Sequence, residues 1–448
     1  MSNQDWLTRS AQAVWHPCTQ MKRHETFPLV PIERAEGAWL QDFDGKRYLD
    51  AVSSWWVNLL GHGHPRIKQA ITGQLNTLEH VMLAGFTHRP VVELSERLGS
   101  LTGLGHAFYG SDGASATEIA LKMSFHYWKN TGHEQKNRFI SLENSYHGET
   151  VGALSVTDVP LFSSTYAPLV RQAMRVPTPD ARNAAPGESA EDVARRAAAA
   201  LENVLAKHAD SVAALIIEPL VQGAAGMAMY HPAYLAEARA LCDRYNIHLI
   251  ADEIAVGFGR TGTLFACEQG NIRPDFLCLS KGITGGFLPL SCVLTRDEIY
   301  QAFYRDDIPS AFLHSHSYTG NALACSAALA VLDTLEDEQI LAANRDKAAR
   351  FTAMLAPLAA SAEIRHFRNT GMIWAFDVDN TRPDFAQAFF AAMLRRGCLV
   401  RPIGTSVYFM PPYCFEDRDM QQLADATQET LFELQQGSAG GARQPALP

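Results

Sequence analysis

The sequence has no long apolar run. No stretch of its 448 residues approaches the roughly 18 consecutive apolar residues that a membrane-spanning helix requires. The longest buried-looking runs, such as Val212–Ile217, have the length of a strand. Residues 1–13 are acidic and polar and lack the apolar segment of a secretory signal. We therefore expect a cytoplasmic protein without a membrane partner.

Paired cysteines are also missing. The chain has eight cysteines, none of them in a C-x-x-C pair, and their spacing suggests neither a zinc site nor a disulfide framework. We expect reduced cysteines, as is usual inside the cell, and no metal site. The eight are Cys18, Cys242, Cys267, Cys278, Cys292, Cys325, Cys398 and Cys414.

Basic residues are fewer than acidic residues. The chain has 38 Lys and Arg against 48 Asp and Glu, which gives a formal net charge of -10. An acidic surface argues against nucleic acid or an anionic membrane as the main partner. It does not exclude a small anionic substrate, because one arginine in a pocket can dominate the local field.

What is present is an alternation of strand-like and helix-like segments in the middle of the chain. This pattern predicts an α/β fold with a mostly parallel sheet. Ser189, followed three residues later by Asp192, resembles the N-cap of an Ala-rich helix that reaches residue 208. Four short apolar segments are typical of buried strands: Arg138–Leu142, Val212–Ile217, residues 248–251 and Phe276–Leu279.

The same pattern predicts how the chain divides into domains. Residues 61–330 would form a large domain. Residues 1–60 would contribute to a small domain and to the active site, and residues 331–436 would form the rest of the small domain. Residues 437–448 are rich in Gly, Ala, Gln and Pro and are predicted to be a disordered tail.

Asp252 and Lys281 are the first candidates for chemistry, because each follows a predicted strand. In open α/β sheets, ligands bind beyond the carboxyl ends of the strands, so both side chains could face one pocket. A desolvated lysine can attack an aldehyde as a Schiff-base nucleophile, and a carboxylate can keep a pyridine nitrogen protonated. Taken alone, each residue has a simpler interpretation that we would favour: Lys281 as a solvent-exposed lysine and Asp252 as a loop aspartate.

Two strings around these residues carry a resemblance to a known family. Residues 250–262 read IADEIAVGFGRTG and residues 274–286 read PDFLCLSKGITGG. In this order and spacing they closely resemble the fold-type I, class III (omega) aminotransferases. The resemblance implies a pyridoxal 5'-phosphate cofactor, with Lys281 as its aldimine lysine and Asp252 at its pyridine nitrogen. It also implies a mostly parallel sheet of the seven-stranded type, flanked by helices, and a smaller α+β domain built from both termini.

A phosphate site is the next requirement of such a cofactor. Residues 109–115 read YGSDGAS and precede a helical pattern over residues 116–128. Small residues at a helix start let backbone N–H groups approach a phosphate, and Gly113 and Ala114 are the best candidates. Relatives often have a hydroxyl residue at the position of Ala114, so that hydrogen bond is missing unless Ser115 supplies it.

The string HSHSYTGNALAC, residues 314–325, resembles a family loop that reaches across a dimer interface to the phosphate. Ser315, His316 and Ser317 match its contact positions, with Ser317 as the expected hydroxyl donor. The resemblance implies a homodimer with shared active sites. An ordinary polar loop is the alternative.

Tyr146 and Glu218 complete the expected cofactor site. Tyr146, in the string Tyr146-His147-Gly148, matches a family tyrosine that covers one cofactor face, where stacking would fix the ring plane. We place it with Lys281 and Asp252 among the catalytic residues. Glu218, at the end of VAALIIEP, is expected in the hydrogen-bond network around the cofactor or the substrate.

Three further strings are Trp15-His16-Pro17, the double tryptophan in DAVSSWW at residues 50–56, and VRPIGTSVYFMPPY at residues 400–413. They resemble those of the 7,8-diaminopelargonate synthases, the adenosylmethionine–8-amino-7-oxononanoate aminotransferases of biotin biosynthesis. Arg401 would pair with a substrate carboxylate. For the double tryptophan at residues 55–56, a buried position in the core is the plainer interpretation. The predicted substrate-binding residues are Cys18, Trp55, Tyr146, Lys281, Ser315, Arg401 and Tyr408.

The resemblance implies a ping-pong reaction through Lys281. The cofactor would take an amino group from S-adenosylmethionine and pass it to 8-amino-7-oxononanoate, giving 7,8-diaminononanoate; lysine is the donor in some relatives. Two positions depart from the family: Cys18 replaces a tyrosine that contacts substrate, and Glu149 replaces an aspartate near it. Arg260 fits a donor contact or a structural salt bridge.

Three other functions remain open at this point. A general omega-amino acid or ornithine aminotransferase would use the same fold with simple amine donors. A racemase, isomerase or decarboxylase would share much of the strand–lysine pattern. A noncatalytic binding protein would not need Lys281, Asp252 and Arg401 together.

Overall fold

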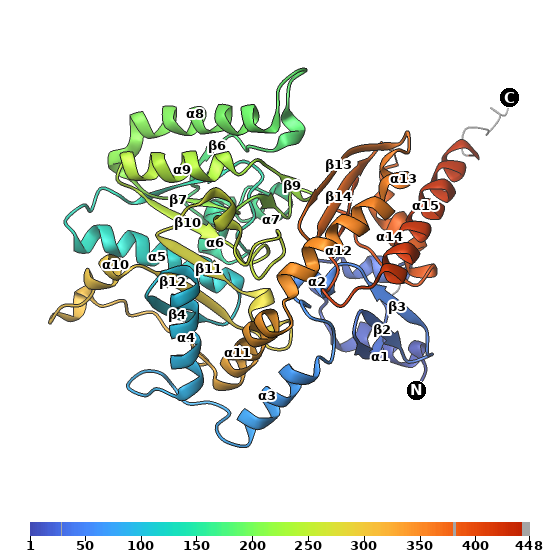
Figure 1. The fold of residues 1–448 in the computed structure, drawn as a ribbon, viewed down its shortest axis with the longest axis horizontal. Coiled ribbons are helices and arrows are strands. Elements are labelled where there is room, and N and C mark those ends of the chain that lie inside the picture. The colour runs from blue at the N-terminus through green and yellow to red at the C-terminus, as the bar shows by residue number, and fades with distance from the viewer. Residues whose placement is uncertain (28, 380–381, 441–448) are drawn as a thin grey trace. The chain divides into compact units, whose positions relative to one another are not determined.

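The computed structural model describes residues 1–27, 29–379 and 382–440, and the chain divides into two compact units. The large unit comprises residues 65–346 and 368–373. The small unit comprises residues 1–64, 347–367 and those from 374 onward. Each unit is described by itself (Figure 1).

The large unit is built on a seven-stranded sheet in the order β4-β12-β11-β10-β7-β5-β6. β12 runs antiparallel to both of its neighbours, while the pairs among β11, β10, β7, β5 and β6 are parallel. The predicted α/β fold with a mostly parallel sheet is confirmed. In sheet order the strands are His106–Gly110, Ser291–Thr295, Phe276–Leu279, His248–Asp252, Val212–Ile217, Arg138–Leu142 and Met174–Val176.

Three of the four predicted strands have the expected bounds, and the fourth, β10, extends by one residue to include Asp252. The predicted N-cap is also confirmed, because Ser189 and Asp192 form a reciprocal capping box at the start of α8. The helices of the large unit are α3 (Pro65–Leu75), α4 (Arg89–Thr102), α5 (Gly113–Asn130), α6 (Val151–Val156), α7 (Pro160–Ser163), α8 (Ala190–His208), α9 (Ala233–Arg244), α10 (Asp297–Gln301) and α11 (Ala322–Asp337).

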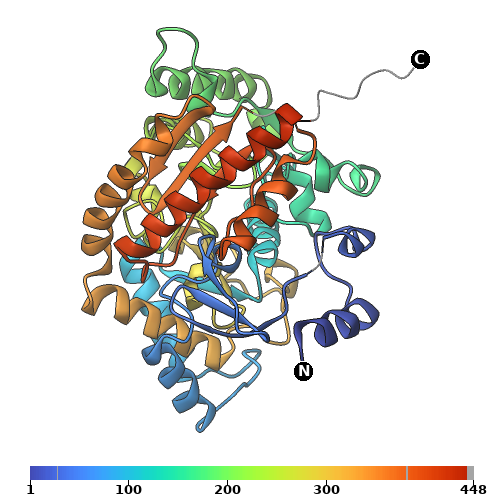
Figure 2. The same ribbon diagram turned by 90° about the vertical axis from the view of Figure 1, so that its right-hand side faces the viewer.

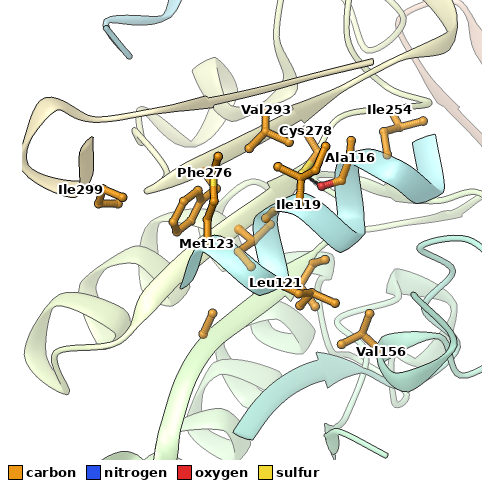
Figure 3. Close-up of a cluster of buried hydrophobic side chains, with 14 residues drawn as sticks. Ala116, Ile119, Leu121, Met123, Val156, Ile254, Phe276, Cys278, Val293 and Ile299 are labelled. Carbon is orange, nitrogen blue, oxygen red and sulfur yellow. Dashed lines mark hydrogen bonds between the residues drawn. The ribbon is translucent and has the colours of Figure 1, made fainter. Parts of the chain in front are cut away.

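Helix α5 forms the core of the large unit with the central strands (Figure 3). Its apolar positions recur at helical spacing, which turns Ala116, Ile119 and Met123 toward the sheet. They meet Phe276 and Val293, which are fully buried on neighbouring strands. Figure 1 shows α8 and α9 side by side, on the side of the sheet away from α5. This packing fixes the start of α5 near the carboxyl ends of the parallel strands.

The small unit joins segments from both ends of the chain, as predicted. β15 (Cys398–Leu399) pairs in parallel with β3 (Arg47–Asp50), which extends the hairpin of β1 (Ile32–Glu36) and β2 (Trp39–Asp42). A second sheet has the order β13-β14-β16. Its strands are Ile364–Thr370, Ile373–Val378 and Ser406–Phe409.

The remaining helices are α1 (Asn3–Ala13), α2 (Ser53–Trp56), α12 (Ile340–Met354), α13 (Ala356–Ala359), α14 (Phe385–Arg395) and α15 (Asp417–Gly440). In Figure 2 the red α15 runs beside the orange α14, and the two helices are in contact. No helix among the described residues is long and apolar enough to cross a membrane.

The units divide at other positions than the predicted domains. The expected boundary between residues 330 and 331 falls inside α11, which packs on α3 and α4 and therefore stays with the large unit. The division comes instead between residues 346 and 347, and residues 368–373 return to the large unit. Of the predicted tail at 437–448, residues from 441 on lie outside the described residues, and α15 continues to Gly440.

Replacing Ile119 with Ala should lower the free energy of unfolding by about 2–5 kcal/mol, because the side chain is fully buried and its loss leaves a cavity. Chemical denaturation followed by circular dichroism measures the change. The control is Leu161→Ala, whose side chain is 81% exposed and should change stability by less than about 0.5 kcal/mol. Equal effects of the two variants would contradict the assigned core.

Candidate active site

Four predicted site residues lie just beyond the carboxyl ends of four strands. Asp252 ends β10, Glu218 directly follows β7, Lys281 comes two residues after β11, and Tyr146 comes four residues after β5. These strands are consecutive neighbours in the parallel part of the sheet. Polar groups from positions 146 to 281 of the sequence therefore meet at one edge, which is where open α/β sheets bind ligands.

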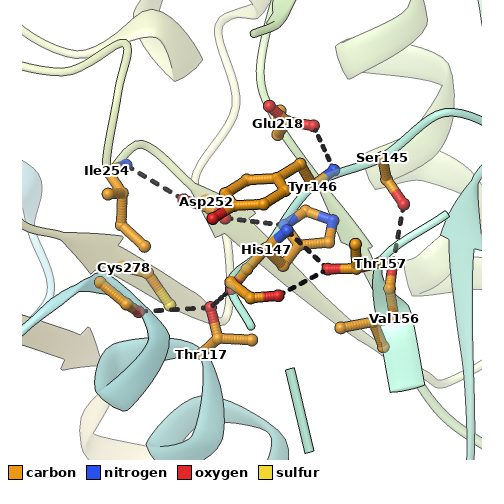
Figure 4. A network of polar contacts seen from close by, with 12 residues as sticks. Thr117, Ser145, Tyr146, His147, Val156, Thr157, Glu218, Asp252, Ile254 and Cys278 are labelled. Carbon is orange, nitrogen blue, oxygen red and sulfur yellow. Dashed lines mark hydrogen bonds and ion pairs between the residues drawn. The ribbon is translucent and has the colours of Figure 1, made fainter. Parts of the chain in front are cut away.

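Asp252 is held on both carboxylate oxygens (Figure 4). Its Oδ2 lies 2.7 Å from Nδ1 of His147, and its Oδ1 accepts a hydrogen bond of 3.1 Å from the backbone N–H of Ile254. When the Asp252 carboxylate is ionised it can only accept, and Nδ1 of His147 is then the donor. With 5% of its surface exposed, Asp252 is a buried carboxylate of fixed orientation.

Two threonines fix His147 in turn. The backbone N–H of His147 donates to Oγ1 of Thr157 at 3.0 Å, and Oγ1 of Thr117 donates to the carbonyl oxygen of His147 at 2.8 Å. Thr117 belongs to α5, so this contact joins the helix start to the Asp252 pair. Figure 4 shows these groups as one connected network.

Lys281 opens the short helix η6 (Lys281–Thr284) with a left-handed φ of 45°. Burial lowers the pKa of its ammonium group, and the negative charges of Asp252 and Glu218 oppose that shift. The net direction favours the neutral amine, which is the nucleophilic form of lysine.

Glu218 is a buried carboxyl group that joins two loops. Its Oε1 accepts from the backbone N–H of Tyr146 at 2.9 Å, and its Oε2 accepts from that of Gly223 at 3.0 Å. Burial raises its pKa to about 7, with His147 opposing and Asp252 adding to the rise. Glu218 thus fixes the backbone at Tyr146.

Tyr146 is partly exposed, and its hydroxyl donates to Oε1 of Glu149 at 2.8 Å. Its ring packs edge-on against Phe162, with centroids 5.5 Å apart. Gly148 brings this loop against α5: at its φ of +119°, a Cβ would lie 2.7 Å from that of Ala114. Only glycine allows this approach.

The start of α5 offers two backbone donors. The N-cap residue Asp112 accepts from the backbone N–H of Ser115 at 2.9 Å, while the Ser115 hydroxyl donates to the same carboxylate at 3.1 Å. The amides of Gly113 and Ala114 belong to the first turn and have no acceptor within the described part of the chain. A phosphate contact from the Ser115 hydroxyl stays a prediction, because here this hydroxyl donates to Asp112.

Ser315, His316 and Ser317 lie in the loop before α11. Both serines are exposed, and the backbone N–H of His316 donates to Oγ1 of Thr319 at 3.1 Å, which closes a turn. In the described part of the chain, no hydrogen bond joins these three residues to Asp252 or His147. The expected phosphate contact of these residues stays a prediction.

The small unit holds the other predicted residues. The guanidinium of Arg401 stacks over the ring of Trp55 at 5.1 Å from its centroid, which brings two substrate candidates together. Tyr408 is buried, and its hydroxyl accepts a hydrogen bond of 3.1 Å from Nε1 of Trp56. Of the double tryptophan, Trp56 is thus the buried core residue and Trp55 is 47% exposed.

The double tryptophan lies in a left-handed turn. Residues 53–56, assigned as α2, all have positive φ, with values of 51°, 46°, 70° and 73°. A left-handed conformation costs about 1–2 kcal/mol for each residue that carries a Cβ. Surrounding contacts must therefore hold this turn. Cys18 lies in another part of the unit, exposed between α1 and η1 (Met21–Glu25) with a φ of 53°.

Comparison with known proteins places this geometry in a family. The model of the family "Aminotransferase class-III" matches residues 20–431. The chain belongs to the class-III aminotransferases. The adenosylmethionine-8-amino-7-oxononanoate aminotransferase of Helicobacter pylori is 45% identical over 432 residues, which cover 95% of this chain and 97% of that protein.

Two solved aminotransferase structures have the same fold. The adenosylmethionine-8-amino-7-oxononanoate aminotransferase of Methanocaldococcus jannaschii superposes with a TM-score of 0.90 at 34% identity, covering 96% of this chain and 99% of that one. An amine transaminase from an uncultivated Pseudomonas species, in its PLP-bound form, gives 0.89 at 30% identity, covering 94% and 98%.

Sequence reasoning about this class-III aminotransferase missed the role of His147. The string Tyr146-His147-Gly148 was recognised for its tyrosine, but a histidine beside an aromatic residue has no distinctive spacing. Only the fold brings it to Asp252, 105 positions away. Thr117 and Thr157 carried no signal, because buried threonines are common in cores.

Glu218→Gln should change how the stability of the cofactor-free enzyme depends on pH. A carboxyl pKa raised to about 7 in the folded state contributes stability that is full below the unfolded value of 4.5 and is lost as pH rises through 7. Between pH 5 and 8, the wild type should lose up to about 3 kcal/mol more than the variant. Urea unfolding at both pH values measures this, and an equal loss in both proteins would contradict the raised pKa.

Proposed function

We propose that this class-III aminotransferase transfers an amino group from S-adenosylmethionine to 8-amino-7-oxononanoate, giving 7,8-diaminononanoate for biotin biosynthesis. The observation that carries the proposal is the meeting of a lysine of lowered pKa, Lys281, with the fixed carboxylate of Asp252 at adjacent strand ends. The two relatives named for this reaction, at 45% and 34% identity, support the choice of substrates.

The residues at the strand ends fit pyridoxal phosphate. Asp252, with its orientation fixed by His147, suits a protonated ring nitrogen, and the open amides of Gly113 and Ala114 at the positive end of α5 suit the phosphate. Tyr146 offers an aromatic face, and Glu218 fixes its backbone. Ser315, His316 and Ser317, contributed by a second copy, would complete the phosphate site in a homodimer.

When bound, pyridoxal phosphate accepts electrons from the substrate carbon that loses a proton. Lys281 would hold the cofactor covalently, and its Nζ would move the proton to and from the substrate carbon. Burial makes this possible, because an amine of ordinary pKa would be almost fully protonated at neutral pH. Donor and acceptor use one site in turn, in a ping-pong sequence.

Arg401 is proposed to bind the carboxylate end of the acceptor, whose long apolar chain suits the ring of Trp55. Tyr146, Cys18 and Tyr408 are further candidates. Glu149 replaces an aspartate of the family, and its carboxylate accepts a hydrogen bond from the Tyr146 hydroxyl. The Glu149 side chain thus orients the phenol of Tyr146. We place the enzyme in the cytoplasm.

A general omega-amino acid aminotransferase is the second candidate. The chain superposes on an amine transaminase with a TM-score of 0.89, so the fold alone is compatible with this second candidate. The stacked pair of Trp55 and Arg401 favours instead an acceptor with a long apolar chain and a terminal carboxylate.

Lys281→Ala should abolish turnover, by at least about 10³-fold, because it removes the amine that would attach the cofactor and move the proton. Cofactor should still bind without a covalent bond, through Asp252 and the start of α5. Steady-state assays and dialysis with absorption spectroscopy measure the two effects. Lys207→Ala, at an exposed lysine on α8, is the matched control. Full activity of Lys281→Ala would overturn the assignment.

A further inference from the structure

We infer that Asp50, Ser54 and His62 form a clamp that presents Trp55 to Arg401 and thereby sets the affinity for the carboxylate-bearing acceptor. We name these three residues the Asp50 clamp. The inference rests on the proposed function, because it assigns the Trp55–Arg401 pair to the acceptor. It concerns the small unit alone.

The Asp50 clamp gathers donors on one buried carboxylate. Asp50 has no exposed surface. Its Oδ1 accepts from the backbone N–H of Ser54 at 2.9 Å, and its Oδ2 accepts from the Ser54 hydroxyl at 2.8 Å. Nε2 of His62 lies 3.2 Å from the same Oδ2. These bonds hold the second residue of the left-handed turn in a conformation that serine alone disfavours.

Two further contacts hold the turn on either side of Trp55. The Ser53 hydroxyl donates to the carbonyl oxygen of Met410 at 2.7 Å, and Nε1 of Trp56 donates to the Tyr408 hydroxyl at 3.1 Å. Ser53 and Trp56 are buried, whereas Trp55 between them is 47% exposed. The backbone of the turn is therefore fixed while the Trp55 ring is left available.

The stack on Trp55 prepares Arg401 for a carboxylate. A guanidinium that stacks on an aromatic ring contacts the ring through its own flat face. Its N–H donors point outward in the guanidinium plane and stay available for a carboxylate. Arg401 itself is exposed and would otherwise sample many rotamers. A turn that holds Trp55 in place thus reduces the freedom that Arg401 must lose when it binds the acceptor.

Ser54→Ala tests the clamp because it removes one hydroxyl without changing the backbone donor. We expect the KM for 8-amino-7-oxononanoate to rise about two- to fivefold, the range of an exposed cation–π contact. The KM for S-adenosylmethionine and kcat should stay unchanged. A purely structural role would instead lower the yield of folded enzyme and kcat while leaving the KM for the acceptor unchanged.

Two comparisons make the test specific. Thr352→Val removes the hydrogen bond of 2.9 Å that Thr352 accepts from Nε1 of another tryptophan, Trp374, and should not change either KM. In an Arg401→Ala background, Ser54→Ala should have no further effect on the acceptor, because the group that it positions is gone. An unchanged KM in Ser54→Ala, or an additive effect in the double variant, would overturn the clamp.

Binding of nonanoate, a carboxylate with an apolar chain that does not react, separates this inference from the proposed function. Titration calorimetry with the holoenzyme should show weaker nonanoate binding in Ser54→Ala and in Arg401→Ala. If both variants weaken it while the wild type does not aminate 8-amino-7-oxononanoate, the clamp stands and the proposed reaction fails. If the wild type aminates the acceptor and Ser54→Ala binds nonanoate normally, the clamp fails and the reaction stands.

Discussion

The hydrogen bond between His147 and Asp252 is the interaction on which the site depends. It fixes a carboxylate at the end of β10, and His147 is itself held by Thr117 on α5 and by Thr157. Through this network the strand end, the helix start and the loop of Tyr146 take one arrangement. The apolar packing of α5 on the sheet supplies the rigidity, since a shift of the helix would move both the amides of Gly113 and Ala114 and the side chain of Thr117.

Charge and burial act together at the same edge. Glu218 and Asp252 are both buried carboxyl groups, and both attract the ammonium form of Lys281. Burial nevertheless dominates and lowers the lysine pKa, while it raises that of Glu218 to about 7. The same desolvation therefore favours the uncharged forms of Lys281 and Glu218, and the neutral amine of Lys281 suits nucleophilic attack and proton transfer.

The sequence predicted what depends on local pattern. Short apolar runs identified β5, β7, β10 and β11, and the strings around Asp252 and Lys281 identified the family. It could not reveal contacts between distant segments, such as that of His147 with Asp252, because neither residue signals its partner. The boundary after residue 330 was misplaced for a similar reason: α11 joins the large unit through packing on α3 and α4. The left-handed turn at residues 53–56 was invisible, since serine and tryptophan do not favour positive φ.

The central claim is that Lys281 and Asp252 serve an aminotransferase whose specific product is 7,8-diaminononanoate. The most direct measurement is to mix the cofactor-loaded enzyme with 7,8-diaminononanoate, the product of the proposed reaction. The reverse reaction is then followed through the absorption band of the bound cofactor. We expect conversion at low concentrations of the diamine and no response to ornithine or β-alanine. A strong response to ornithine or β-alanine, with none to the diamine, would contradict it.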